Sequence, residues 1–131
     1  SSILTAVGET GLFLYKFGAS TTIPFENKNI KTPLQIIANN KKLGLHTLIL
    51  LDIKDNKLMT TKQGITYLID NDIKNVRIVI ASCLGSSNQQ IFYGNIKNLA
   101  EIQLIKGPQV IIFPGKLHFI EKEALQYFAN K

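Results

Sequence analysis

The sequence predicts an α/β domain with a mixed β-sheet of about five strands flanked by helices. Apolar runs of the kind that form strands covered on both faces recur along the chain. Between these runs lie segments with apolar residues at helical spacing, bounded by capping residues and glycines. Hydrophobic residues make up 45% of the 131 residues and charged residues 18%, which suffices for the core of one domain.

Each predicted strand is a short apolar run that ends at a turn signal. We expect strands at 20–23, 46–53, 76–84, 90–93 and 110–113. The run at 46–53 is the most continuous and is therefore assigned to the middle of the sheet. Gly85 follows the 76–84 run, and Pro114 follows the 110–113 run. Both residue types are typical of turns.

Helices are predicted in the remaining segments. Thr32 followed by Pro33 has the pattern of an N-cap before a first-turn proline, and Gly44 lies just past the end of that helix. A second helix opens at 60–63 and a third runs from 121 to 129, with two glutamates in its first turn. The segments 2–8 and 95–104 are also expected to be helical.

Composition excludes several classes of function. The net charge is +6, but the lysines are scattered and Arg77 is the single arginine, which argues against direct nucleic-acid binding. One cysteine, Cys83, excludes an internal disulfide, and two histidines without ligand-spaced partners predict no metal site. No apolar run is long enough to cross a bilayer, and the first residues lack the basic region of a secretory signal. The single cysteine favours a reducing setting, so we expect a cytoplasmic protein.

Polar or glycine residues at the ends of apolar elements are the candidates for a ligand site, because α/β folds bind ligands at strand ends. Ser2 begins a helix, where free N–H groups suit a polar ligand; a plain cap is the alternative. Asp52 and Lys54 follow the central strand and predict either a substrate contact or a surface ion pair. Leu84 precedes a glycine and is expected either to pack on a flat ring or to begin a hairpin loop.

The strongest candidate for acid–base chemistry is His118, in a turn that also holds Lys116. An imidazole near neutral pH suits deprotonation of a substrate amine. The alternative is that His118 caps the following helix. His46, at the start of the central strand, is interpreted as structural, and Cys83 as a small core residue rather than a nucleophile.

The segments taken together resemble the diphthine synthases, a family of tetrapyrrole-methylase-like methyltransferases, in the archaeal form. The matching segments are Ser2-Ile3, Ala6-Val7-Gly8, Thr10-Gly11-Leu12, Tyr15-Lys16-Phe17-Gly18, Thr22-Ile23-Pro24-Phe25, Gly44-Leu45-His46-Thr47-Leu48, Leu51-Asp52-Ile53-Lys54, Met59-Thr60, Leu84-Gly85-Ser86 and Pro114-Gly115-Lys116-Leu117-His118-Phe119. They cover nearly the whole chain in order.

The resemblance implies a two-domain enzyme whose C-terminal domain corresponds to residues 1–131. In the family the cofactor lies between the two domains, and the N-terminal domain carries a glycine-rich motif that this sequence lacks. The resemblance therefore implies that an N-terminal half is missing, and that the isolated chain is inactive. It also implies a cytoplasmic enzyme, which we expect to be a homodimer.

The cofactor implied by the resemblance is S-adenosyl-L-methionine. The matching cofactor positions are Ser2, Ile3, Leu51, Leu84 and Gln109. Gln109 stands where the family often has histidine, and Cys83 where it has arginine. Proximity and a dry pocket are the main contributions of such a protein, worth about 7–11 kcal/mol.

The acceptor implied by the resemblance is the amino-carboxypropyl-modified histidine of elongation factor two, the protein substrate. We infer that His118 accepts the amine proton, directly or through a water molecule, and that Lys54 or Lys116 pairs with the substrate carboxylate. Two alternatives are a related methylase that acts on a tetrapyrrole and a stand-alone binding or regulatory module without catalysis. The Pro-Gly-Lys-Leu-His run argues against the first.

Overall fold

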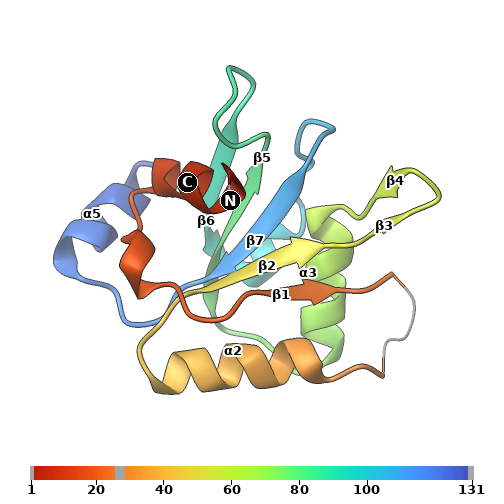
Figure 1. Ribbon diagram of the computed structural model, residues 1–131, viewed down its shortest axis with the longest axis horizontal. Coiled ribbons are helices and arrows are strands. Elements are labelled where there is room, and N and C mark those ends of the chain that lie inside the picture. The colour runs from red at the N-terminus through yellow and green to blue at the C-terminus, as the bar shows by residue number, and fades with distance from the viewer. Residues whose placement is uncertain (1, 26–28, 130–131) are drawn as a thin grey trace.

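A mixed five-stranded sheet forms the centre of the protein, as predicted (Figure 1). The structure is a computed structural model, which describes residues 2–25 and 29–129. The strand order is β1-β2-β7-β5-β6. The strands are β1 (Thr21–Ile23), β2 (Thr47–Leu51), β5 (Arg77–Ser82), β6 (Gln90–Asn95) and β7 (Gln109–Phe113).

The pairing directions give the sheet two distinct ends. β1 and β2 are parallel, whereas β7 is antiparallel to both of its neighbours and β6 is antiparallel to β5. The C-terminal ends of β1, β2 and β5 therefore lie together with the starts of β6 and β7. We call this the carboxyl end of the sheet, and the opposite side, where β2 starts and β7 finishes, the amino end.

Side chains alternate between two cores, one on each face of the sheet, because successive strand residues point to opposite faces. Ile49 and Ile111 belong to one core, Leu48 and Ile112 to the other. The first core is closed by α2 (Thr32–Lys42), α3 (Thr61–Asp70) and α4 (Ile96–Leu99), the second by α1 (Ser2–Val7) and α5 (Phe119–Gln126). Each buried Ile or Leu contributes about 1.5–3 kcal/mol.

Three predicted helix bounds are wrong. The N-cap of α2 is Lys31 rather than Thr32. α5 begins at Phe119 and ends at Gln126, instead of running from 121 to 129. The predicted helix at 95–104 ends at Leu99. Ile102 and Leu104 both pack on the first core, and a spacing of two residues suits an extended chain rather than a helix.

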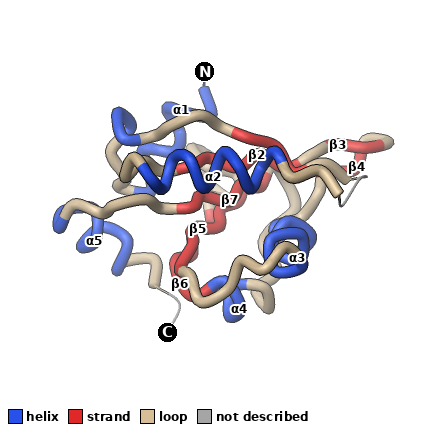
Figure 2. The backbone as a smooth tube through the Cα atoms, turned by 90° about the horizontal axis from the view of Figure 1, so that it is seen from below, coloured by secondary structure: helices blue, strands red, loops and turns tan. Residues whose placement is uncertain are grey.

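The predicted strand 46–53 is also too long. β2 ends at Leu51, and a small hairpin follows, formed by β3 (Ile53–Lys54) and β4 (Lys57–Leu58). Asp55 and Asn56 occupy its turn with φ of 51° and 61°, as a two-residue hairpin turn requires. Figures 1 and 2 show this hairpin at one end of the molecule and α5 at the other. Within the described ranges, no helix is long and apolar enough to cross a membrane.

Candidate functional site

Two adjoining depressions lie at the carboxyl end of the sheet. The first, of about 320 Å³, is lined by Ile3, Ala6, Cys83, Leu84, Pro108 and Val110. The second, of about 340 Å³, is lined by Ile3, Leu50, Leu51, Ile53, Leu58, Met59, Pro108, Gln109 and Val110. The two share Ile3, Pro108 and Val110 and therefore form one continuous, largely apolar surface between α1, β2, β7 and the β5–β6 loop.

Four of the five predicted cofactor-binding residues meet on this surface. Leu84 lines the first depression, Leu51 and Gln109 the second, and Ile3 both. The strand directions explain the meeting, because β2 and β5 finish where β7 starts. The fifth residue, Ser2, begins α1 as predicted, but its side chain lies outside the described part of the structure.

The loop after β5 serves two purposes. It connects β5 to β6 as a hairpin, which confirms one of the two interpretations of this segment, and it also places Leu84 in the depression. Gly85 has a φ of +85°, and a Cβ atom there would lie 3.5 Å from the Cβ of Ala6. Cys83 is not a core residue: it is half-buried, has a φ of 54° and lines the first depression.

Gln109 uses its side chain inside the protein. Its Oε1 accepts a hydrogen bond of 2.8 Å from the backbone N–H of Thr61, at the start of α3, and its Nε2 donates to Ile105 O over 3.2 Å. The side chain is buried and joins α3 to the chain that leads into β7. The amide thus has a structural partner on each side.

Asp52 holds the chain at the end of β2. Its Oδ2 accepts from Phe25 N–H (3.2 Å) and its Oδ1 from Ile53 N–H (2.8 Å). Its backbone N–H donates to Ile23 O, and its carbonyl accepts from Met59 N–H. Asp52 therefore fixes the β3–β4 hairpin, which projects from the carboxyl end of the sheet (Figure 1). The hairpin carries the exposed Lys54 on β3.

A further depression of about 300 Å³ lies between the end of β1 and α3. It is lined by Ile23, Pro24, Phe25, Met59, Gln63, Thr66, Tyr67, Asp70 and Asn71. None of the sequence-predicted site residues lines it. In the described part of the chain, no three His, Cys, Asp or Glu side chains are grouped so that they could hold a metal ion.

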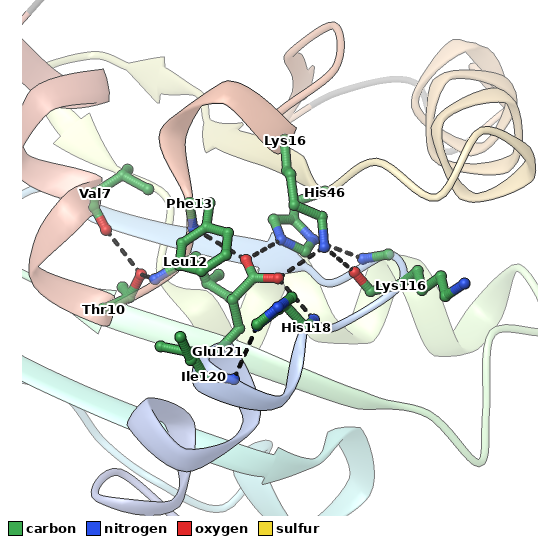
Figure 3. A network of polar contacts seen from close by, with 11 residues as sticks. Val7, Thr10, Leu12, Phe13, Lys16, His46, Lys116, His118, Ile120 and Glu121 are labelled. Atoms are coloured by element: carbon green, nitrogen blue, oxygen red, sulfur yellow. Dashed lines mark hydrogen bonds and ion pairs between the residues drawn. The ribbon is translucent and has the colours of Figure 1, made fainter.

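At the amino end of the sheet, a buried carboxylate organises a polar network (Figure 3). Glu121 Oε1 accepts from Lys16 Nζ (2.7 Å) and His118 N–H (2.9 Å). Its Oε2 accepts from Phe13 N–H (2.9 Å) and contacts His46 Nε2 (2.7 Å). The Glu121 side chain is completely buried. Four donors therefore replace the water that this charge loses.

The pKa of Glu121 follows from that arrangement. Burial by itself raises the pKa of the carboxyl. The hydrogen bonds from Lys16, from two backbone N–H groups and from the His46 imidazole outweigh burial, and the pKa falls from 4.5 to about 2. Glu121 is therefore ionised throughout the physiological range.

His46 is structural, as interpreted from the sequence. Its side chain is completely buried, and its Nδ1 accepts a hydrogen bond of 2.9 Å from Gly115 N–H. Because Nδ1 is an acceptor, the proton of the neutral ring is assigned to Nε2, which donates to Glu121. Burial lowers the pKa of His46 below 6.5 and outweighs Glu121, which raises it.

His118 and Lys116 lie in this amino-end region, away from Leu51 and Leu84. His118 Nδ1 accepts from Ile120 N–H (3.1 Å), and the His118 N–H donates to Glu121, so the two residues form a capping box at the start of α5. The capping interpretation of His118 is thereby confirmed. Its catalytic role stays a prediction, and so does substrate binding by Lys116, whose side chain extends away from the network in Figure 3.

Sequence reasoning missed the central position of Glu121. Its only signal was the spacing His118-x-x-Glu121, which has the form of a capping box with an unusual N-cap residue. Contacts with His46 and Lys16 span 75 and 105 residues and leave no local pattern.

Comparisons with known proteins point to one family. A diphthine synthase of Methanococcus maripaludis is 40% identical over 96% of this chain, which covers 54% of that protein. A diphthine synthase of Methanocaldococcus jannaschii is 39% identical over 98% of this chain, which covers 56% of it. A crystal structure of a diphthine synthase superimposes with a TM-score of 0.89 at 34% identity, covering 97% of this chain and 51% of the other. No protein-family model matches. The chain thus spans about half the length of the curated relatives it matches.

Proposed function

Because the chain is a relative of the diphthine synthases and corresponds to part of such a protein, we propose that it forms one half of a methyltransferase of diphthamide biosynthesis. The methyl donor is S-adenosyl-L-methionine, and the acceptor is the amino-carboxypropyl-modified histidine of elongation factor two. The remaining half is an N-terminal domain that supplies the facing wall of the cleft. The protein works in the cytoplasm as a homodimer.

One observation carries this proposal beyond the relationship itself. Ile3, Leu51, Leu84 and Gln109 come from four segments separated in sequence, and all four line the depressions at the carboxyl end. A surface of this kind suits the adenosine part of the donor, because ligand sites are mainly apolar with few polar groups. Its residues fit the expected cofactor.

The chain's own residues contribute binding and orientation. Leu51 and Leu84 would hold the adenosine and exclude water, and Ile3 on α1 lines the same surface. Because Gln109 has side-chain partners inside the protein, its contribution comes from the backbone. When bound, S-adenosylmethionine supplies the methyl group, so the protein mainly provides proximity and a dry pocket.

The substrate side of the cleft is assigned to the hairpin at the carboxyl end. Lys54 lies on β3, which Asp52 fixes beside the second depression. We assign to Lys54 the pairing with the substrate carboxylate. Lys116 and His118 lie at the amino end, so a part in the reaction would require a substrate that also reaches that end.

Calorimetry and methyl transfer test the proposal together. The 131-residue chain should fold but bind S-adenosylmethionine weakly and show no turnover, because one wall leaves the donor partly solvated. The full-length protein should bind it more tightly. Transfer should occur to elongation factor two that carries the amino-carboxypropyl histidine and not to the unmodified factor. Transfer to a precorrin alone, or tight binding by the 131-residue chain, would contradict the proposal.

A further inference from the structure

The amino end of the sheet displays a row of aromatic side chains. The ring centroids of Tyr15 and Phe13 lie 5.7 Å apart, those of Phe13 and His118 5.5 Å, and those of His118 and Phe119 4.4 Å. Tyr15 is 82% exposed and Phe119 65% exposed. We call these four residues the aromatic row. Exposed apolar groups that lie together mark interaction surfaces more often than single ones do.

The buried network holds this row in place. Glu121 accepts hydrogen bonds from the backbone N–H groups of Phe13 and His118, which carry the two middle rings. Lys16 donates to Glu121 and to Lys116 O, and so ties the 13–17 segment to the turn before α5. A backbone that is already fixed loses little further entropy when a partner binds the side chains it carries.

The surroundings of the row carry positive charge. Three segments meet there, because Lys116 N–H donates to Gly44 O and His46 N–H donates to Lys16 O. These segments, 13–17, 41–46 and 115–120, contain four lysines and no aspartate or glutamate; Lys16 is paired with Glu121, which leaves Lys41, Lys42 and Lys116 as the positive charges. Glu121 is buried and fully bonded, and the exposed Lys122 and Glu123 that follow on α5 balance each other, so the surroundings of the row stay positive.

The aromatic row and the positive charge around it together favour an acidic protein segment as the binding partner. An apolar centre with a charged rim is the usual composition of a protein interface. A second copy of the chain, docked symmetrically, would bring lysines against lysines. Nucleic acid is disfavoured because these segments contain no arginine, and the described lysines stand singly or as the one pair Lys41-Lys42 rather than in a basic run.

We propose that the aromatic row and its lysines form a docking surface for an acidic segment of the protein substrate, separate from the cofactor surface at the carboxyl end. The identity of that substrate, elongation factor two, rests on the proposed function. The row anchors the partner through Tyr15 and Phe119, and the lysines accelerate the encounter. The surface sets affinity for the protein substrate and not the rate of methyl transfer.

The test uses the full-length protein with Tyr15→Ala and Phe119→Ala combined, and separately with Lys116→Glu. Tyr127→Ala is the matched aromatic control, since Tyr127 is 90% exposed at the end of α5 and outside the row; Lys62→Glu on α3 is the charge control. Binding of elongation factor two is measured by interferometry, and the KM for the modified factor by methyl transfer.

We expect the alanine pair to weaken binding and raise KM about tenfold or more, with kcat and cofactor affinity unchanged. Lys116→Glu should weaken binding most at low salt. The controls should behave like the parent. If the unsubstituted protein binds the factor but does not methylate it, the proposed function is contradicted. The binding measurements on the variants would still test the docking surface.

Unchanged binding in the alanine pair would overturn the docking surface, as would a parent that does not bind the factor. Conversion of a dimer into a monomer by the Tyr15→Ala and Phe119→Ala pair, measured by sedimentation, would also overturn the docking surface. The aromatic row would then join two copies of the chain. A single-stranded RNA homopolymer tests the nucleic-acid alternative. If the RNA binds the parent but not the alanine pair, while the alanine pair still binds the factor, the surface would be assigned to nucleic acid instead.

Discussion

His46 and Glu121 are 75 residues apart in sequence, yet His46 Nε2 and Glu121 Oε2 lie 2.7 Å from each other with both side chains completely buried. The contact joins the start of β2 to α5. Together with Lys16, it also fixes the segment before β1. The amino end of the domain is therefore held by a largely buried charged cluster, whereas the carboxyl end exposes apolar depressions.

Glu121→Gln should lower the free energy of unfolding by about 3–5 kcal/mol, because the amide nitrogen would face two N–H donors and the largely buried Lys16 would lose its counter-charge. Urea unfolding of the 131-residue chain measures the effect. Glu123→Gln, an exposed position on the same helix, is the control and should change stability by less than about 0.5 kcal/mol. Equal effects at both positions would refute the role given to Glu121.

The same carboxylate predicts acid sensitivity. Its pKa is about 2 in the folded protein and 4.5 when unperturbed, so the unfolded chain binds the proton first. The stabilisation, about 3 kcal/mol, is complete above pH 4.5 and is lost as the pH falls towards 2. Unfolding curves at several pH values should show this loss in the parent. Glu121→Gln should lack that part of the pH dependence.

His46 should remain neutral in the folded protein at pH values where an ordinary histidine is charged. Burial lowers its pKa below 6.5, so stability that is present above pH 6.5 is lost as the pH falls through the lower, folded value. Nitrogen NMR of the imidazole reports both the charge and the Nε2–H tautomer. Titration at or above pH 6.5, or a proton on Nδ1, would contradict the assigned hydrogen bond from Gly115.

His118→Asn and His118→Ala together separate capping from catalysis. Asparagine is a good N-cap, whereas alanine leaves the Ile120 N–H without its partner and should cost about 1 kcal/mol of stability. If His118 does not act as a base, the Asn variant of the full-length protein keeps the parental kcat and stability. Equal loss of kcat in both variants, with the Asn variant stable, would instead support a base, whereas a rise in KM alone would reflect the place of His118 in the aromatic row.

Leu84→Asp in the full-length protein should weaken S-adenosylmethionine binding about ten- to a hundredfold, because a charge would lie against an apolar ring. Stability should fall less, since Leu84 lines an open depression. Leu43→Asp, at an exposed leucine of the amino end, is the matched control. Calorimetry that finds the same cofactor affinity in a folded Leu84 variant would remove this residue from the site.

Local sequence patterns predict much of this domain. The five strands appear as apolar runs, and the opening of α3 at 60–63 is visible in four adjacent residues, because strand faces and helix caps depend on near neighbours. The end of β2 was misplaced, since Ile53 is as apolar as the strand before it. The hydrogen bonds of Asp52 and the Asp55–Asn56 turn direct the chain into a hairpin there.

The amino-acid sequence alone predicts the fold class and, through the family resemblance, the residues proposed to face a cofactor. Tertiary structure decided which of them meet: antiparallel β7 brings Gln109 beside the ends of β2 and β5, with Leu51 and Leu84, and it carries Lys116 and His118 to the opposite end. It also decided that Glu121 is the centre of a buried network. Strand direction and contacts across 75 or more residues arise from the packing of the whole chain, which no local pattern encodes.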